Sequence, residues 1–167
     1  VILIHGGGWS HGSSKDMKRM AVQFAQNGFV AASINYTLSG VGHYPAARED
    51  CQRAVRWLIE NSKKFYINEN LISLFGESAG GHLAMLVGYG SGLNIKSVIA
   101  VSAPSDLEDP RANSNLSVKA FLGSQVETDP SIYEVASPVH YIREKMPTTL
   151  IIHSQNDKLV PIDQAEQ

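Results

Sequence analysis

The stretch Leu71-Ile-Ser-Leu-Phe-Gly-Glu-Ser-Ala-Gly-Gly-His-Leu-Ala84 decides the fold, because an apolar run leads into a glycine-rich turn and a helical run leads out of it. Its centre, Gly76-Glu-Ser-Ala-Gly80, is a G-x-S-x-G sequence in the strand-turn-helix context that gives this motif its meaning. Side chains two positions either side of the serine would collide with neighbouring backbone, which accounts for the glycines. We interpret Ser78 as a nucleophile aimed outward at the positive end of a helix. The alternative is a glycine-rich turn with an incidental serine.

A second glycine-rich segment, His5-Gly-Gly-Gly-Trp9, directly follows an apolar run at residues 1–4. A segment of this type after a strand is typical of the loop that stabilises the oxyanion in acyl transfer, where each preorganised donor contributes about 3 kcal/mol. We assign donors to the N–H groups of Gly7, Gly8 and Ala79, the last of which follows the serine. A phosphate-binding turn is the alternative, but the spacing G-x-G-x-x-G and a following Lys-Ser/Thr are both lacking.

Two residues flank these glycines. His5 stands at the end of the expected strand, so we predict that it hydrogen-bonds within the loop and orders it rather than acting in catalysis. Trp9 has two interpretations, a packing residue or part of the pocket wall, and the sequence does not separate them.

Apolar β-rich runs alternate with amphipathic stretches along the whole chain, a pattern typical of βα units that build a parallel sheet. The near-continuous hydrophobicity of the apolar runs predicts central strands that are buried on both faces. The expected strands cover residues 1–4, 29–35, 71–75, 97–102 and 149–153. The expected helices cover residues 16–26, ended by Gly28, residues 45–61, and a stretch that starts just after Ser78.

Residues 107–138 break this alternation. They are polar and rich in proline, and only residues 118–122 show a periodic apolar pattern. We therefore interpret residues 1–167 as a single domain in which this excursion lies over the carboxyl ends of the strands as a partial lid.

The composition supports one globular domain and argues against nucleic acid as a partner. The 167 residues are 43% hydrophobic, and the net charge of −2 arises from 14 basic and 16 acidic residues that are spread along the chain. The single cysteine, Cys51, cannot form an internal disulfide, and its apolar neighbours indicate a buried structural thiol rather than a reactive one.

No apolar run approaches the about 20 residues that a membrane-spanning helix needs, and the opening Val-Ile-Leu-Ile is too short for a signal-peptide core. We therefore expect a soluble chain without a membrane span and favour a cytoplasmic location. The chain begins without Met inside an expected strand, which indicates that upstream residues are missing. A secretion signal ahead of Val1 stays open for that reason.

With these two motifs, the chain resembles the esterase and lipase branch of the α/β-hydrolases related to hormone-sensitive lipase. It is more closely similar to the small HGGGW esterases that include feruloyl- and acetylxylan-esterase-like proteins. The resemblance implies the α/β-hydrolase fold, a mostly parallel sheet covered on both faces, here without its usual leading strands and C-terminal histidine segment. It covers nearly the whole chain, and the further matching segments are residues 36–39, 44–50, 54–58, 137–139 and 152–161.

The resemblance also implies a Ser-Asp-His triad in that chain order, with the acid in a loop after the strand that follows the excursion. Asp157 fits, because it stands in a pattern similar to H-G-x-x-D-x-x-V-P, with Ser154 in place of the usual glycine. Asp163 is the competing acid, but we expect it in the first turn of the next helix. Asp50 and Asp106 are lesser candidates, which we expect to tie a helix to a loop and to shape the pocket floor, respectively.

The general base is the member of the triad that the chain does not supply. In the family pattern the histidine follows the acid by a few tens of residues, whereas this chain ends ten residues after Asp157. We expect His82 to point into packing, and we do not expect His43, His140 or His153 to replace the base. The hypothesis is therefore a chain truncated at both ends, with the catalytic histidine beyond Gln167.

We expect the parent protein to hydrolyse small or short-acyl carboxylic esters through an acyl-enzyme, with no metal or organic cofactor and a small-molecule ester as its partner. An arylformamidase or a peptidase-like amide hydrolase of the same fold is the alternative among enzymes. A non-catalytic module is the alternative for residues 1–167 alone, from which we expect little or no turnover of p-nitrophenyl acetate. Acyl length, the alcohol part and the oligomeric state are not predicted.

Overall fold

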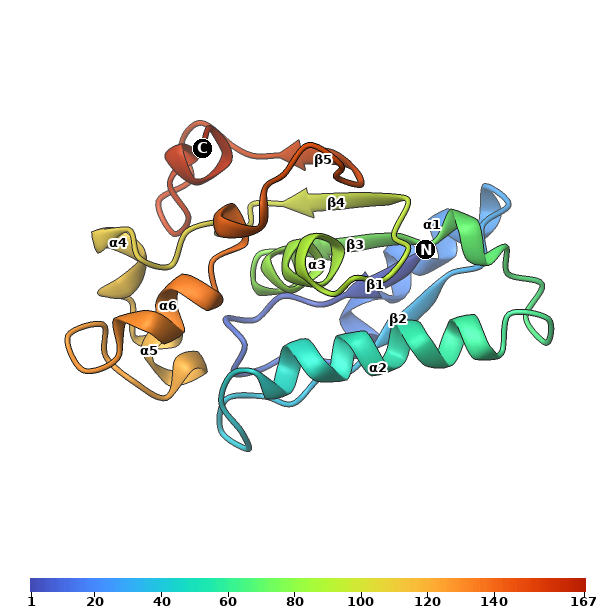
Figure 1. The fold of residues 1–167 in the computed structure, drawn as a ribbon. Helices are drawn as coiled ribbons and strands as arrows, with labels where there is room; N and C mark the ends of the chain where they lie inside the picture. The colour runs from blue at the N-terminus through green and yellow to red at the C-terminus, as the bar shows by residue number, and fades with distance from the viewer.

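The computed structural model describes residues 1–167 and contains one five-stranded parallel sheet (Figure 1). The order β2-β1-β3-β4-β5 means that the chain leaves β1 towards one edge and then returns to the other side of β1. In such sheets, ligands bind at the carboxyl ends of the strands where the order reverses, here between β1 and β3. The strands are β1 (Ile2–Ile4), β2 (Ala32–Ile34), β3 (Ser73–Glu77), β4 (Ser97–Val101) and β5 (Thr148–Ile152).

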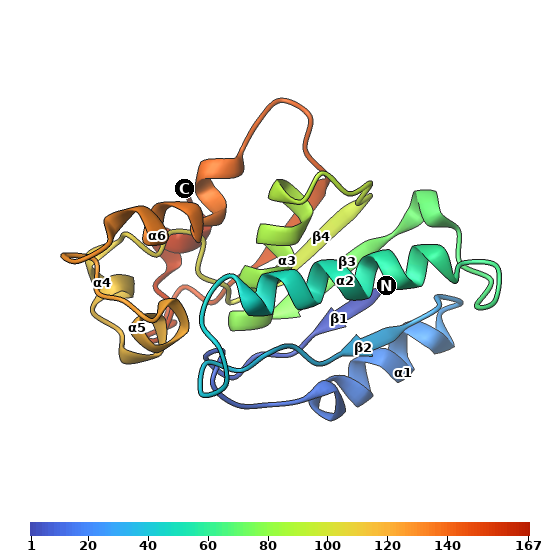
Figure 2. The ribbon, with the colours of Figure 1, turned by 60° about the horizontal axis from the view of Figure 1, so that its bottom comes forward.

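Helices cover both faces of the sheet, as the βα alternation predicts. Helices α2 (Ala46–Glu60) and α3 (Ala79–Gly90) lie on one face, and α1 (Lys18–Gln26) lies on the other with the 3-10 turn η1 (Ser14–Met17) before it (Figure 2). Successive strand residues point to opposite faces, so Ile2 and Ile4 of β1 join the core under α2 and α3. The residue between them, Leu3, packs with Met17 on the α1 side.

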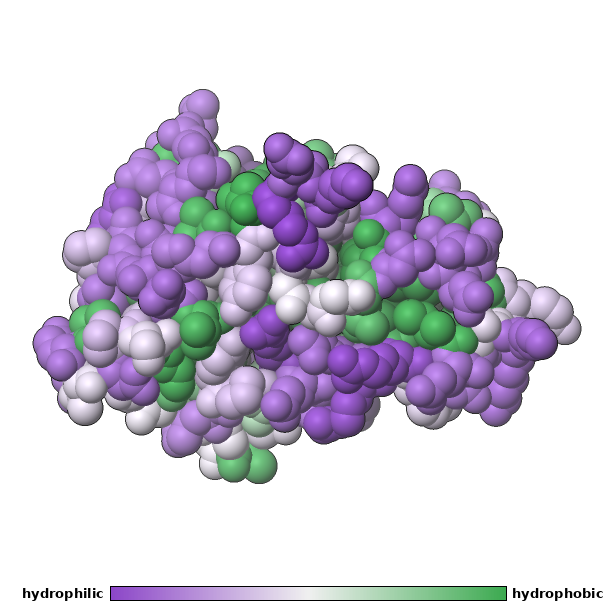
Figure 3. All heavy atoms as spheres, in the orientation of Figure 1, coloured by the Kyte–Doolittle hydropathy of each residue, from purple (hydrophilic) through white to green (hydrophobic).

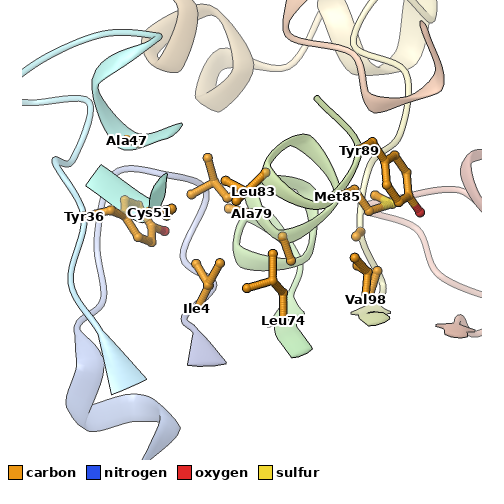
Figure 4. Close-up of a cluster of buried hydrophobic side chains, with 14 of the residues drawn as sticks. Ile4, Tyr36, Ala47, Cys51, Leu74, Ala79, Leu83, Met85, Tyr89 and Val98 are labelled. Atoms are coloured by element: carbon orange, nitrogen blue, oxygen red, sulfur yellow. The ribbon is translucent and has the colours of Figure 1, made fainter. Parts of the chain in front are cut away.

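Helix α3 is buried on all sides and forms the centre of the larger core. Its residues from Ala79 to Tyr89 are all buried between the sheet, α2 and the later part of the chain. Figure 4 shows Ile4, Leu74 and Val98 of three adjacent strands pointing towards this helix. The helix that begins directly after Ser78 is therefore the most completely buried helix of the molecule.

Helix α1 ends as its glycine predicts. Gly28 has a φ of 85°, and its N–H donates to the carbonyl of Ala25 at 3.1 Å. The next N–H, of Phe29, donates to the carbonyl of Phe24 at 3.1 Å. This is the Schellman arrangement, in which a left-handed residue satisfies the last carbonyls of a helix.

Two strands begin two or three residues later than predicted. Strand β2 begins only at Ala32, and Phe29, 52% exposed, lies in the connection before it. Strand β3 begins at Ser73, because the turn η2 (Glu69–Leu71) occupies the residues before it. An apolar run fixes the existence of a strand more firmly than its first residue.

Within residues 1–167, the two edge strands of the sheet are not buried on both faces, in contrast to the prediction for all strands. Strand β5 pairs only with β4, and its Leu150, Ile151 and Ile152 are each more than 40% exposed. Helix α1 contacts the β2 side of its face, so β5 has no helix over it there. The apolar character of β5 therefore does not by itself indicate burial.

The excursion of residues 107–138 is more ordered than its composition predicts. It forms α4 (Pro110–Asn113), α5 (Leu116–Leu122) and α6 (Pro130–Val135), and the turn η3 (Pro138–Tyr141) follows. These helices lie beyond the carboxyl ends of the strands in both ribbon views (Figures 1 and 2). Their apolar residues are part of the main core, namely Val118, Phe121, Leu122 and Tyr133.

The surface of the face shown in Figure 3 is mostly hydrophilic, with hydrophobic patches between. The longest helix, α2, has 15 residues. None of the helices combines the length and the apolar character that crossing a bilayer requires.

Candidate active site

Ser78 stands alone between the last residue of β3 and the first residue of α3. Its φ of 52° and ψ of −121° lie in a region that residues with a side chain rarely adopt, so the turn is strained. Steric crowding explains the flanking glycines. A Cβ on Gly76 would collide with the backbone of Gly80, and a Cβ on Gly80 would collide with the carbonyl oxygen of Ile4.

The Ser78 side chain opens onto a cavity of about 340 Å³ at the carboxyl ends of the strands. Its hydroxyl makes no hydrogen bond to another side chain, while its N–H donates to the carbonyl of Val101 at 2.7 Å. Three separate segments form most of the cavity wall, contributing Gly7, Gly8 and Trp9 after β1, Asn115, Ser117 and Val118 from α5 and its cap, and Leu159, Val160 and Pro161 after β5.

The glycine loop, residues 5–9, curls so that its N–H groups stay free. Gly7 and Gly8 have φ values of 113° and 55°, and the N–H groups of Ser10 and His11 close the turn on the carbonyl of Gly7 at 3.1 and 3.2 Å. The N–H groups of Gly7 and Gly8 have no acceptor within the chain. The N–H of Ala79, in the first turn of α3, has no carbonyl four residues earlier in the helix. The N–H groups of Gly7 and Gly8, which line the cavity, and that of Ala79 thus have no partner within the chain, and their role as oxyanion donors stays a prediction.

His5 is buried at the start of this loop and does not line the cavity. Its ring stacks on that of Tyr36, with centroids 4.2 Å apart, and its Nδ1 lies 2.7 Å from the carbonyl oxygen of Gly6. The Tyr36 hydroxyl donates to the carbonyl oxygen of His5 at 3.1 Å. These contacts fix the position of the first residue of the glycine loop, and the loop-ordering role of His5 stays a prediction.

Trp9 both packs and lines the cavity, so the two interpretations of this residue are not exclusive. Its Nε1–H donates to Nδ1 of His82 at 3.3 Å, and its ring stacks on Phe121 of α5 with centroids 4.6 Å apart. The other ring nitrogen of His82, Nε2, donates to the carbonyl of Ala136 at 2.8 Å. His82 lies one turn after Ser78 and thereby joins the elbow, the glycine loop and the excursion.

This position makes His82 a poor base and gives a pH-dependent prediction. Burial lowers its pKa to about 4, from about 6.5 for an exposed histidine, and the nearby charge of Arg48 acts in the same direction. Between pH 6.5 and about 4, His82 is protonated in the unfolded chain but neutral in the folded chain. The free energy of unfolding therefore decreases as the pH falls through this range. We expect a His82→Gln variant to lack this loss.

Urea unfolding of the native protein and of the His82→Gln variant at pH 7.5, 6, 5 and 4.5 measures the effect. We expect the variant to be less stable at pH 7.5, because the amide packs less well than the imidazole. The difference in the free energy of unfolding between the two proteins should become smaller towards pH 4.5. A difference that stays constant over this range contradicts a neutral, buried His82.

Asp157, the predicted acid, lies behind the cavity wall rather than in it. Its Oδ1 accepts from the N–H groups of Leu159 and Val160 at 2.9 and 3.0 Å. The hydrogen bond from Val160 is the main reason that the pKa of Asp157 lies below its usual value, so it is a carboxylate at neutral pH. His153 donates from Nε2 to the Val160 carbonyl at 2.7 Å and lies 3.9 Å from Asp157 Oδ2. Asp157 and Ser78 are brought to the same end of the sheet but do not touch.

The other acidic candidates have structural partners. Asp163 lies in the first turn of η4 (Ile162–Ala165), as expected, and pairs with Arg111 of α4 at 2.7 Å. Asp50 accepts from the N–H and the hydroxyl of Thr37, which ties α2 to the loop after β2 as expected. Asp106 accepts from the N–H of Glu108 at 2.8 Å and does not line the cavity, so its expected place on the pocket floor is wrong.

Cys51 also agrees with its structural interpretation. It is fully buried in α2, and burial raises the pKa of its thiol, which opposes formation of the reactive thiolate.

None of the six histidines hydrogen-bonds to Ser78, since each has another partner. One of them, His11, lines the cavity, a place that was not predicted for it from the sequence. It follows the glycine loop directly, is exposed, and has Nδ1 3.0 Å from the hydroxyl of Ser10. Its place two residues after Trp9 was the available indication.

Further polar residues of the wall were also missed, among them Ser117 and Gln164. The Gln164 Oε1 accepts from the N–H groups of Ser105 and Asp106, both at 2.8 Å, and so fixes the loop after β4. Both residues lie in segments without a recognisable motif, and only the folded chain brings them to Ser78.

Comparison with known proteins identifies related chains. The family model described as BD-FAE matches residues 1–167. Esterase LipC of Mycobacterium tuberculosis is 29% identical over 185 residues, and the match covers 99% of this chain. Arylacetamide deacetylase of Bos taurus is 31% identical over 129 residues, which cover 73% of this chain.

A solved structure extends this likeness to the fold. The acetyl ester-xyloside bifunctional hydrolase from Caldicellulosiruptor lactoaceticus superposes with a TM-score of 0.87 at 27% sequence identity, and the match covers 99% of this chain and 64% of that one. This chain spans 46% of the length of LipC and 28% of the length of the deacetylase. It therefore corresponds to less than half of either curated relative.

Proposed function

Because the chain belongs to the BD-FAE family and has the α/β-hydrolase fold, we propose that its parent protein is a serine hydrolase that cleaves small carboxylic esters through an acyl-enzyme. The observation that carries the proposal is the strained turn at Ser78. It presents an unpaired hydroxyl to a cavity whose wall includes Gly7 and Gly8 of the glycine loop.

In the proposed reaction, the Ser78 hydroxyl oxygen attacks the ester carbonyl carbon and its proton passes to a histidine base. The tetrahedral intermediate collapses, the alcohol leaves with that proton, and the acyl group remains on Ser78. Water then attacks the acyl-enzyme with the help of the same base and releases the carboxylic acid. No other reactant is required.

Negative charge on the former carbonyl oxygen is the main electrostatic demand of this reaction. The N–H groups of Gly7, Gly8 and Ala79 are the proposed donors to it. The first two make no hydrogen bond within the chain, so they need not break one to receive the oxygen. The amino end of the 12-residue helix α3 adds a favourable dipole at the same place.

Asp157 is the proposed acid that orients the base. Its lowered pKa keeps it charged at neutral pH, where it stabilises a protonated histidine. None of the histidines of residues 1–167 hydrogen-bonds to Ser78, so we propose a base from another part of the parent protein.

Amide cleavage is the second candidate, and the likeness to arylacetamide deacetylase favours it. The test compares kcat/KM of the native gene product for p-nitrophenyl acetate, an aryl formamide and an aminoacyl amide. We expect the ester to have the highest value. A preference for either amide reverses the order of the two candidates, and the absence of turnover with all three supports a non-catalytic module.

A further inference from the structure

Ser117, in helix α5 of the excursion, lies directly against the glycine loop. Its Oγ is 3.2 Å from the position that a Cβ on Gly8 would take, and its Cβ is 3.4 Å from that point. Both Gly8 and Ser117 line the cavity that contains Ser78. A hydroxyl from the excursion therefore borders the proposed oxyanion donors.

The Ser117 hydroxyl has no partner in the folded chain. Its N–H donates to Asn115 Oδ1 at 2.8 Å, but its Oγ makes no hydrogen bond, not even to the preceding turn of its helix. The side chain is only half-buried, and its Oγ is accessible to solvent. It is thus an accessible donor and acceptor in the cavity wall.

Packing fixes where this hydroxyl stands relative to Ser78. Phe121, one turn after Ser117, is 1% exposed and stacks on Trp9. Trp9 donates to His82, which lies in the helix that begins after Ser78. Because each of these side chains is buried in the main core, Ser117 is held against the glycine loop rather than on a mobile lid.

We propose that the Ser117 hydroxyl donates a hydrogen bond to an oxygen of the ester bound at Ser78, and so acts as a substrate-binding residue supplied by the excursion. The inference rests on the proposed ester hydrolysis. The hydrogen bond forms in the Michaelis complex and persists in the transition state, so it governs KM more than kcat.

The test uses the native gene product and its variants Ser117→Ala and Ser117→Thr, with p-nitrophenyl acetate as substrate. Ser117→Ala should lower kcat/KM by about tenfold, mainly through a higher KM, as expected for the loss of one hydrogen bond. Ser117→Thr keeps the hydroxyl and should recover most of the affinity. Ser114→Ala is the matched control, because Ser114 lies in the same excursion, is exposed, and bonds only to the carbonyl of Arg111.

Stability distinguishes this role from a structural one. Since the Ser117 hydroxyl makes no hydrogen bond in the chain, Ser117→Ala should leave the urea midpoint unchanged or slightly raised. An unchanged KM in Ser117→Ala, beside a native protein that hydrolyses the ester, overturns the inference alone. A native protein without ester turnover overturns the proposed function instead.

Discussion

Replacement of Ser78 by alanine should lower ester hydrolysis by the native gene product by about five orders of magnitude, because the variant has no oxygen to form the acyl-enzyme. Alanine adopts the same strained backbone at that position, so the fold should remain. The measurement is kcat/KM for p-nitrophenyl acetate, with the urea midpoint as the measure of folding. Mass spectrometry after treatment with an aryl phosphonate should find the adduct on Ser78 in the native protein.

Ser114→Ala provides the control, since it removes an exposed hydroxyl of the same chain that does not line the cavity. Its activity should equal that of the native protein. If Ser78→Ala retains activity within tenfold of the native protein, the nucleophile lies elsewhere.

The second large effect concerns Gly80, where a methyl group should prevent normal folding. Glycine to alanine within a helix ordinarily stabilises by about 1 kcal/mol. At Gly80, however, the new Cβ would collide with the carbonyl oxygens of Ile4 and His5 at the end of β1. Backbone atoms cannot rotate away as a side chain does, so we expect a loss of about 3 kcal/mol or more in the free energy of unfolding. Urea unfolding and the yield of folded protein report the result.

Gly40→Ala is the matched control for this prediction. A Cβ on Gly40 has no heavy atom within 4 Å, and its φ is not in the left-handed region. We expect this variant to be as stable as the native protein or slightly more stable. A Gly80→Ala variant with the stability of Gly40→Ala would show that β1 and α3 can separate without cost.

The turn at Ser78 and the glycine loop, which form the candidate site, are the parts of the molecule that the sequence predicted best. Around Ser78 and the glycine loop, strong steric demands restrict the residues to a few types, so the pattern and the geometry correspond closely. Steric restriction also explains why the end of α1 at Gly28 was predictable, because Gly28 has a φ of 85°. The exposure of β5 within residues 1–167 was not predictable, because an apolar run does not specify which segments pack against it.

The residues of the cavity wall are the part of the candidate site that the sequence predicted least. Ser117 gains its importance from contact with Gly8, which is distant in sequence, and helix α5 owes its position to the stacking of Phe121 on Trp9. Neither contact leaves a local pattern. The assignments of Ser78, Asp157, Gly7, Gly8 and Ala79 remain predictions, and Ser78→Ala tests the first of them.

The backbone conformation at Ser78 lowers the thermal stability of the fold at the same residue that is proposed to react. A residue held at a φ of 52° costs about 1–3 kcal/mol, and glycine at that position would release most of this cost. A directed-evolution campaign that selects only for survival of heating would therefore enrich chains that have lost the proposed nucleophile. Libraries derived from this protein should be sorted on product formation in the same round, so that the strained serine is retained.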